Sequence, residues 1–177
     1  MKTKKLILTA DEIKLMMYRL AAEIAEKNKG LENICLVGIK SRGVPMAERF
    51  REYYKKNFRT EVPIGIIDIS LYRDDLSKVA DDPVHNGTNM SFDVTGKTLI
   101  LTDDVLYSGK TVQTALSVIK QLGEPAKIAL CVLIDRGHKT LPIFAEYTGK
   151  FVDTAPNEVI KVAFSETDGE EFVKIME

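Results

Sequence analysis

The chain has 177 residues, enough for one well-packed core, and we expect a single domain over residues 1–177. Hydrophobic residues make up 45% and charged residues 29%, as in ordinary globular proteins, which excludes a disordered or fibrous chain. Because 25 Lys and Arg nearly balance 26 Asp and Glu, no overall field attracts nucleic acid or anionic membranes.

The cysteines and the apolar runs indicate the compartment. Cys35 and Cys131 lie far apart in apolar runs, without the spacing of a metal site or a disulfide scaffold, so we expect two buried free thiols. The apolar run near the N-terminus is too short for a signal peptide, and no later run approaches the length of a membrane span. These features predict a cytoplasmic protein with no membrane partner.

Helix and strand patterns alternate along the chain. Apolar residues recur with the helical period from Ile13 to Ala25, after a start signal at Thr9 and before a stop signal at Gly30. Apolar runs predict strands at 34–39, 64–72, 98–102, 127–134 and 159–164, and periodicity predicts helices at 44–57 and 111–123. This alternation favours an α/β fold with a mostly parallel sheet flanked by helices. Such sheets bind ligands at the carboxyl ends of their strands.

The stretch LILTDDVLYSGKT places two acidic residues at a strand end and a small polar turn before a helix. Unpaired backbone N–H groups at the helix start, with the hydroxyls of Ser108 and Thr111, can hold a phosphate, and Gly109 lets the backbone approach it. Asp103 and Asp104 would repel a polyphosphate, so their partner is neutral or cationic: the vicinal hydroxyls of a sugar, or Mg²⁺. The stretch therefore predicts a ribose 5-phosphate ligand.

Four segments in this order resemble one family over nearly the whole chain: LVGIKSRG, DISLYRDDLSK, DDVLYSGKT and VLIDRGHKTLPI. The family is PyrR, pyrimidine-operon regulators that are also uracil phosphoribosyltransferases. The third segment is similar to the phosphoribosyl pyrophosphate (PRPP) signature of the type I phosphoribosyltransferase superfamily. The resemblance implies the type I phosphoribosyltransferase fold, with a small hood over the base site, and a reaction of uracil with PRPP that gives UMP and pyrophosphate.

The resemblance also implies roles for single residues. Asp103 and Asp104 hold the ribose hydroxyls and, directly or through water, Mg²⁺, and their charge favours a cationic ribosyl centre. Ser41 and Arg42 belong to a pyrophosphate loop, in which the superfamily often has a non-proline cis peptide bond. The expected substrate-binding residues are Ser41, Arg42, Asp103, Asp104, Val105, Leu106, Tyr107, Ser108, Gly109, Lys110, Thr111, Arg136 and Val159.

The segment from Tyr72 to Pro83 follows a predicted strand and lacks clear periodicity, which predicts a mobile lid. By resemblance, this lid closes over PRPP and excludes water. Arg73 is expected to contact the pyrophosphate, whereas for Lys78 a pyrophosphate contact and a solvated surface charge are equally good interpretations. The expected catalytic set is Asp103, Asp104, Arg42 and Arg73.

The base site is assigned by resemblance alone. Arg136 is expected beside the nucleotide, and the main chain around Val159 is expected to read uracil, although Val159 also fits an ordinary strand. His138 receives no catalytic role, because no partner base or nucleophile is identifiable. The group that takes the proton of uracil N1 is not assigned.

Two other functions stay open. One is a UMP-dependent RNA-binding regulator of pyrimidine-operon attenuation, alone or beside the enzyme, with the candidate RNA-binding residues Lys14, Arg19, His138 and Lys139. Ala22 and Phe144 stand where the RNA-binding members tend to carry basic side chains, which predicts weak binding to leader RNA or none. The other is a phosphoribosyltransferase for a different base. The family also suggests a homo-oligomer, a dimer or larger.

Overall fold

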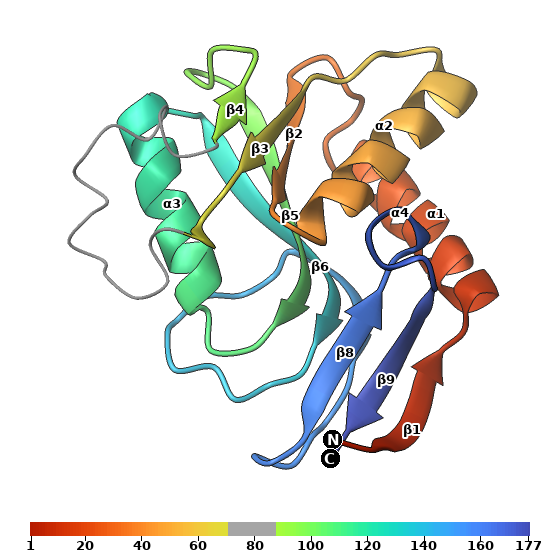
Figure 1. The fold of residues 1–177 in the computed structure, drawn as a ribbon. Coiled ribbons are helices and arrows are strands. Elements are labelled where there is room, and N and C mark those ends of the chain that lie inside the picture. The colour runs from red at the N-terminus through yellow and green to blue at the C-terminus, as the bar shows by residue number, and fades with distance from the viewer. Residues whose placement is uncertain (71–87) are drawn as a thin grey trace.

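The computed structural model describes residues 1–70 and 88–177 (Figure 1). Its elements, in chain order, are β1 (Thr3–Leu8), α1 (Ala10–Lys27), β2 (Ile34–Ile39), α2 (Gly43–Phe58), β3 (Ile64–Ile67), β4 (Asn89–Met90), β5 (Thr98–Leu106), α3 (Lys110–Leu122), β6 (Lys127–Asp135), β7 (Tyr147–Phe151), β8 (Val159–Ala163), α4 (Ser165–Asp168) and β9 (Phe172–Met176). In these two ranges, no helix combines the length and the apolar character that a membrane crossing requires.

The strands form two sheets. The larger sheet has six strands in the order β4-β3-β2-β5-β6-β7, and all neighbours are parallel except β3 and β4. Helix α3 covers one face, and α1 and α2 cover the other (Figure 1). Because both faces are covered, β2 is buried at every residue, which explains its continuous apolar run. The α/β fold with a mostly parallel sheet is confirmed.

The two faces of the larger sheet carry separate cores. The core under α1 and α2 includes Ile13, Leu20, Phe50, Tyr54, Tyr147 and Phe164, and the core under α3 includes Val37, Leu101, Val112, Val118, Ile119 and Val132. Cys35 and Cys131 are buried and free, as expected, and burial raises the pKa of both thiols. Packing on both faces fixes the strand ends that carry the candidate site.

Local signals set the start of α1, as predicted. Thr9 caps this helix, since its Oγ1 accepts a hydrogen bond from the backbone N of Glu12 at 3.4 Å. The Glu12 carboxylate accepts one in return from the backbone N of Thr9 at 2.8 Å, which completes a capping box. The helix then runs through the predicted apolar stretch and ends at Lys27.

Two predicted strands have different ends in the structure. The strand predicted over 64–72 stops at Ile67, because the Asp68 carboxylate accepts hydrogen bonds from the backbone N and Oγ of Ser70, at 3.0 and 2.6 Å. Residues 71 and 72 of this prediction lie outside the described residues. The strand predicted over 98–102 instead continues to Leu106, because its pairing with β6 extends to the partners Leu106 and Asp135. Long-range pairing, which a local pattern does not record, sets this second end.

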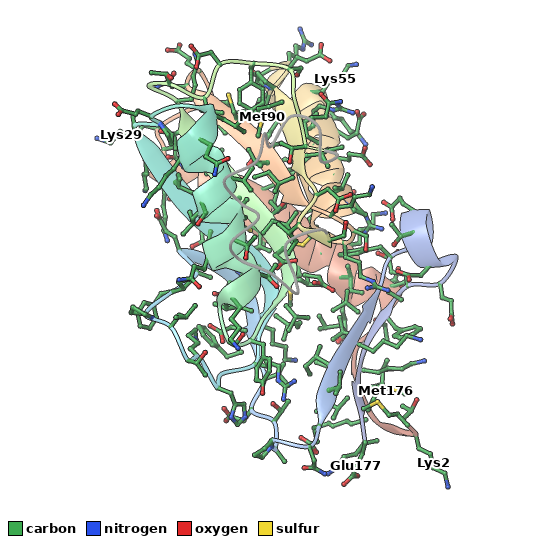
Figure 2. The ribbon with its side chains drawn as sticks, turned by 60° about the vertical axis from the view of Figure 1, so that its left-hand side comes forward. Lys2, Lys29, Lys55, Met90, Met176 and Glu177 are labelled. Atoms are coloured by element: carbon green, nitrogen blue, oxygen red, sulfur yellow. The ribbon has the colours of Figure 1, made fainter. Side chains whose placement is uncertain are left out.

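The second sheet is small and antiparallel, with the order β1-β9-β8. We call this sheet, together with α4, the hood. Only β8 was predicted, whereas β1, which is mostly exposed, and β9, which is as short as β8, were not. Lys2 and Glu177 exchange backbone hydrogen bonds of 2.8 and 3.0 Å, so both termini lie side by side at the far end of the hood (Figure 2). The end with α4 lies near α2 (Figure 1).

Candidate active site

The paired carboxylates lie inside β5, near its carboxyl end. Asp103 pairs with Val132 of β6, so the expectation that both aspartates sit where the chain leaves the sheet is corrected: the strand continues past them to Leu106. Asp103 is 8% exposed, and Asp104 is half-buried. Since the strands are parallel, this position is the ligand-binding edge that the fold class predicts.

The electrostatics of the pair favour a cationic or hydroxyl-bearing partner. Asp103 Oδ1 accepts a hydrogen bond from the backbone N of Asp104, and Asp104 Oδ1 accepts one from Val105 N, both at 2.9 Å. Burial raises the pKa of the Asp104 carboxyl, and a hydrogen bond with Asp103 and the charge of Arg42 lower it in part. Arg42, from the loop between β2 and α2, therefore acts on the same site.

The turn after β5 leads into α3 at the place where the sequence predicts a phosphate cradle. Gly109 precedes α3 with φ +90°, a left-handed conformation that glycine adopts readily. The backbone N of Lys110 donates to Ser108 Oγ at 3.4 Å. The N–H groups of Thr111 and Val112 precede the first intrahelical hydrogen bond, which runs from Gln113 N to the carbonyl oxygen of Gly109 at 2.9 Å. Leu141 and Ile143 pack over Gly109, so the segment after β6 covers one side of the turn.

The loop before α2 packs directly against β5. The peptide bond between Lys40 and Ser41 is cis, as the superfamily resemblance suggested for this loop. Thr102, the residue before Asp103, donates from Oγ1 to the carbonyl oxygen of Gly43 at 2.7 Å. A Cβ atom on Gly43 would lie 2.1 Å from the carbonyl oxygen of Thr102, so only glycine permits this approach. The loop and the paired carboxylates are therefore one structural unit.

The hood supplies a partner for Arg42. Arg42 donates from Nε and Nη2 to the two carboxylate oxygens of Asp168 in α4, at 3.2 and 2.8 Å. These hydrogen bonds hold the pKa of the Asp168 carboxyl well below its ordinary value and raise the pKa of Arg42. The expected pyrophosphate loop is thus linked to the hood, a contact that no local pattern predicted.

Arg136 links the end of β6 to the segment before β8 and to the turn after β5. It is 6% exposed, and it donates from Nη2 to the carbonyl oxygen of Glu158 at 2.7 Å and from Nε to Thr154 Oγ1 at 3.1 Å. Its guanidinium lies 4.3 Å from the ring centroid of Tyr107. Val159, the first residue of β8, is 43% exposed. The expected nucleotide residues from three separate segments are therefore close in space.

Not every predicted site residue joins this group. Lys14 and Arg19 lie on α1, whereas His138 and Lys139 follow β6 close behind Arg136. His138 does contact the group, since its Nε2 lies 2.6 Å from the carbonyl oxygen of Thr154 and its ring centroid lies 6.2 Å from that of Tyr107. Arg19 donates to the carbonyl oxygen of Gly149 at 2.6 Å, and Lys139 forms an ion pair with Asp135 at 2.7 Å. Arg73, Lys78 and the predicted lid fall outside the described residues.

Four residues of this region were not singled out from the sequence: Thr102, Thr154, Glu158 and Asp168. Their partners are far away in the chain, and Asp168 is 126 positions from Arg42. In the residues that the structure describes, no three His, Cys, Asp or Glu side chains form a metal-binding cluster.

The comparisons with known proteins agree on fold and family. The phosphoribosyl transferase domain family matches residues 5–167. A bifunctional protein PyrR of Deinococcus deserti is 49% identical over 172 residues, covering 97% of this chain and 94% of the relative. Another, of Pelotomaculum thermopropionicum, is 50% identical over 176 residues, covering 99% and 97%.

Solved structures with low sequence identity share the fold. A hypoxanthine phosphoribosyltransferase of Staphylococcus aureus has a TM-score of 0.73 at 18% identity, covering 99% of this chain and 93% of its own. The corresponding enzyme of Trypanosoma cruzi also has a TM-score of 0.73 at 18% identity, covering 98% and 96%. The arrangement of sheet, helices and hood is therefore that of a phosphoribosyltransferase.

Proposed function

The chain belongs to the PyrR family of type I phosphoribosyltransferases, and from this premise we propose that it is a uracil phosphoribosyltransferase. Different residues of its site bind the ribose, the phosphate groups and the base. The enzyme transfers the ribose 5-phosphate group of PRPP to uracil, giving UMP and pyrophosphate. One observation carries this: paired carboxylates, a helix-start turn and Arg42 lie together at the carboxyl edge of the parallel sheet. The 177 residues act as one domain, because Arg42 and Arg136 join the larger sheet to the hood.

Asp103 and Asp104 hold the ribose. Their carboxylates accept hydrogen bonds from the two vicinal hydroxyls, and their negative charge stabilises the positive charge that develops on the ribosyl carbon. The pair also fits Mg²⁺, held directly or through water, because two adjacent carboxylates, one with its pKa raised by burial, gain from a nearby cation. When bound, Mg²⁺ neutralises part of the charge of the pyrophosphate group.

The phosphate groups are held at two places. Backbone N–H groups and hydroxyls from Tyr107 to Thr111, at the positive end of α3, bind the 5-phosphate. Ser41 and Arg42 bind the pyrophosphate, and Arg42 balances the charge that grows on it as the bond to the ribosyl carbon breaks. Arg73 is proposed to add a second positive charge from the segment that the structure does not describe.

The hood binds the base. Arg136 fixes the carbonyl oxygen of Glu158, which orients the main chain at the start of β8. The adjacent main-chain groups of Val159 are then available for the edge of uracil. Backbone donors and acceptors in fixed positions discriminate bases by their hydrogen-bonding pattern, because a mismatched base leaves buried polar groups unpaired.

The test compares product formation with four different bases. The purified enzyme with PRPP and Mg²⁺ is expected to release UMP and pyrophosphate with uracil, and far less product with cytosine, hypoxanthine or guanine. Product is measured by chromatography, and a variant with Asn at both Asp103 and Asp104 serves as the inactive control. Turnover with a purine but not with uracil would contradict the base assignment and leave the phosphoribosyltransferase class intact.

RNA regulation is a second candidate, because the relatives named above are called bifunctional. We expect only weak, salt-sensitive binding to the organism's pyrimidine-operon leader RNA, since Arg19 and Lys139 already have protein partners and Ala22 carries no charge. A gel shift with and without UMP at near-physiological salt measures this. Tight, sequence-specific binding that UMP enhances would overturn the expectation. A cytoplasmic location and a homo-oligomer, a dimer or larger, complete the proposal.

A further inference from the structure

Asp168 is held more firmly than its place in a surface segment suggests. Its Oδ2 atom accepts hydrogen bonds from the backbone N of Phe164 at 3.0 Å and from Thr167 Oγ1 at 2.8 Å, in addition to Arg42 Nε. Its Oδ1 atom accepts from Arg42 Nη2. The carboxylate therefore has a fixed orientation before it meets the arginine, and the pair has the two-point geometry of a strong Arg–carboxylate interaction.

A second arginine fixes this segment to α2. Arg49 donates from Nε and Nη2 to the two carboxylate oxygens of Glu166 at 2.7 and 2.8 Å, and it also pairs with Glu171. Its guanidinium lies 4.9 Å from the ring centroid of Phe164. Helix α4 is thus attached to the same helix that begins directly after Arg42. This attachment, to which Glu171 and Phe164 contribute beside Glu166, is separate from the Arg42–Asp168 pair.

The two edges of the Arg42 guanidinium have different surroundings. The side edge, Nε and one N–H of Nη2, faces Asp168, and within the described parts of the chain the side-chain hydrogen bonds of Arg42 all go there. The end edge, formed by Nη1 and the remaining N–H of Nη2, has two further parallel N–H donors that can bind two oxygen atoms of one anion. The charges of Arg42 and Asp104 act on each other, so the guanidinium lies within electrostatic range of the paired carboxylates.

We infer that Asp168 is a positioning residue: it holds the side edge of Arg42 so that the end edge faces the pyrophosphate of PRPP. A free arginine side chain populates many rotamers, and fixing it in one rotamer on binding costs conformational entropy. A carboxylate that fixes the rotamer before the ligand arrives removes this cost, so it strengthens binding without touching the ligand. The inference rests on the proposed role of Arg42 in the reaction.

The test compares two single substitutions in α4. Asp168→Asn keeps the shape of the side chain but removes its charge and one acceptor, and we expect kcat/KM for PRPP and the affinity for magnesium pyrophosphate to fall about tenfold, with an unchanged KM for uracil. Glu166→Gln is the matched control, because it weakens an equivalent arginine pair of the same helix away from the site. We expect it to alter thermal stability to a similar extent without changing pyrophosphate affinity. Calorimetric titration with pyrophosphate measures binding independently of turnover.

Two further variants separate the possible failures. In an Arg42→Ala background, adding Asp168→Asn is expected to cause no further loss of pyrophosphate affinity. The single variant Asp168→Glu keeps the charge, and it is expected to retain part of the pyrophosphate affinity that Asp168→Asn loses. An equal loss from Asp168→Asn with and without Arg42, or identical behaviour of Asp168→Asn and Glu166→Gln, would overturn the positioning role. If Arg42→Ala impairs PRPP turnover and Asp168→Asn does not, this inference fails alone. Normal turnover in Arg42→Ala would reject the proposed role of Arg42 and this inference with it.

Discussion

Replacing Asp103 and Asp104 together by Asn is expected to reduce PRPP turnover by about two to four orders of magnitude. Each lost charge-assisted hydrogen bond removes roughly 1.5–3 kcal/mol, which is about ten- to a hundredfold in rate, and the variant also loses the charge that we propose stabilises the ribosyl centre. Steady-state release of UMP measures the effect. The two substitutions remove no large group from the core, so the loss comes from chemistry and not from unfolding.

The thermal stability of the same variant tests this distinction. Burial raises the pKa of Asp104, so folding disfavours its charged form at neutral pH, and a neutral Asn does not add to that cost. We therefore expect a thermal midpoint equal to that of the unmodified protein or higher. Asp93→Asn, which makes the same chemical change at a turn before β5, is the control and should keep full activity. A folded double variant with normal UMP synthesis would reject the assignment of the carboxylates.

Replacing Gly43 by Ala is expected to destabilise the protein by about 1–3 kcal/mol or more and to impair PRPP binding. The new Cβ would lie 2.1 Å from the carbonyl oxygen of Thr102, which is a backbone atom of a buried strand and cannot move aside cheaply. The hydrogen bond from Thr102 Oγ1 to the carbonyl oxygen of Gly43 would also lengthen or break. Because α2 begins here, Arg42 would shift with it. Urea unfolding and KM for PRPP measure the two effects.

A second glycine tests whether the close approach is the cause. Gly96 has φ +71°, and no other part of the described chain comes within 4 Å of the position that a Cβ atom would take there. Gly96→Ala should therefore cost only the left-handed backbone penalty, about 1 kcal/mol, and leave KM unchanged. If the two substitutions had equal effects on stability and on KM, the close approach of Gly43 to Thr102 would not be the cause of the loss.

Features that depend on neighbouring residues could be predicted from the sequence. Three such local patterns are present in the structure: the continuous apolar runs of β2 and β6, the cap of α1 at Thr9, and the strand, turn and helix around Gly109. Periodicity and turn chemistry act over a few residues, so they can be recognised without knowing the fold. The ligand-binding edge followed from these patterns, because parallel strands place their carboxyl ends together.

Features that join distant segments were decided only by the tertiary structure. Strand β1 pairs with β9 at the opposite end of the chain, the end of β5 depends on its pairing with β6, and Arg42 meets a carboxylate 126 positions away. An exposed edge strand and an acidic residue in a polar segment have no distinctive local pattern, since their structure comes from a partner that the fold brings to them. The sequence alone therefore determined the family and the residues of the candidate site, whereas the tertiary structure decided that Asp168 of the hood holds the side chain of Arg42.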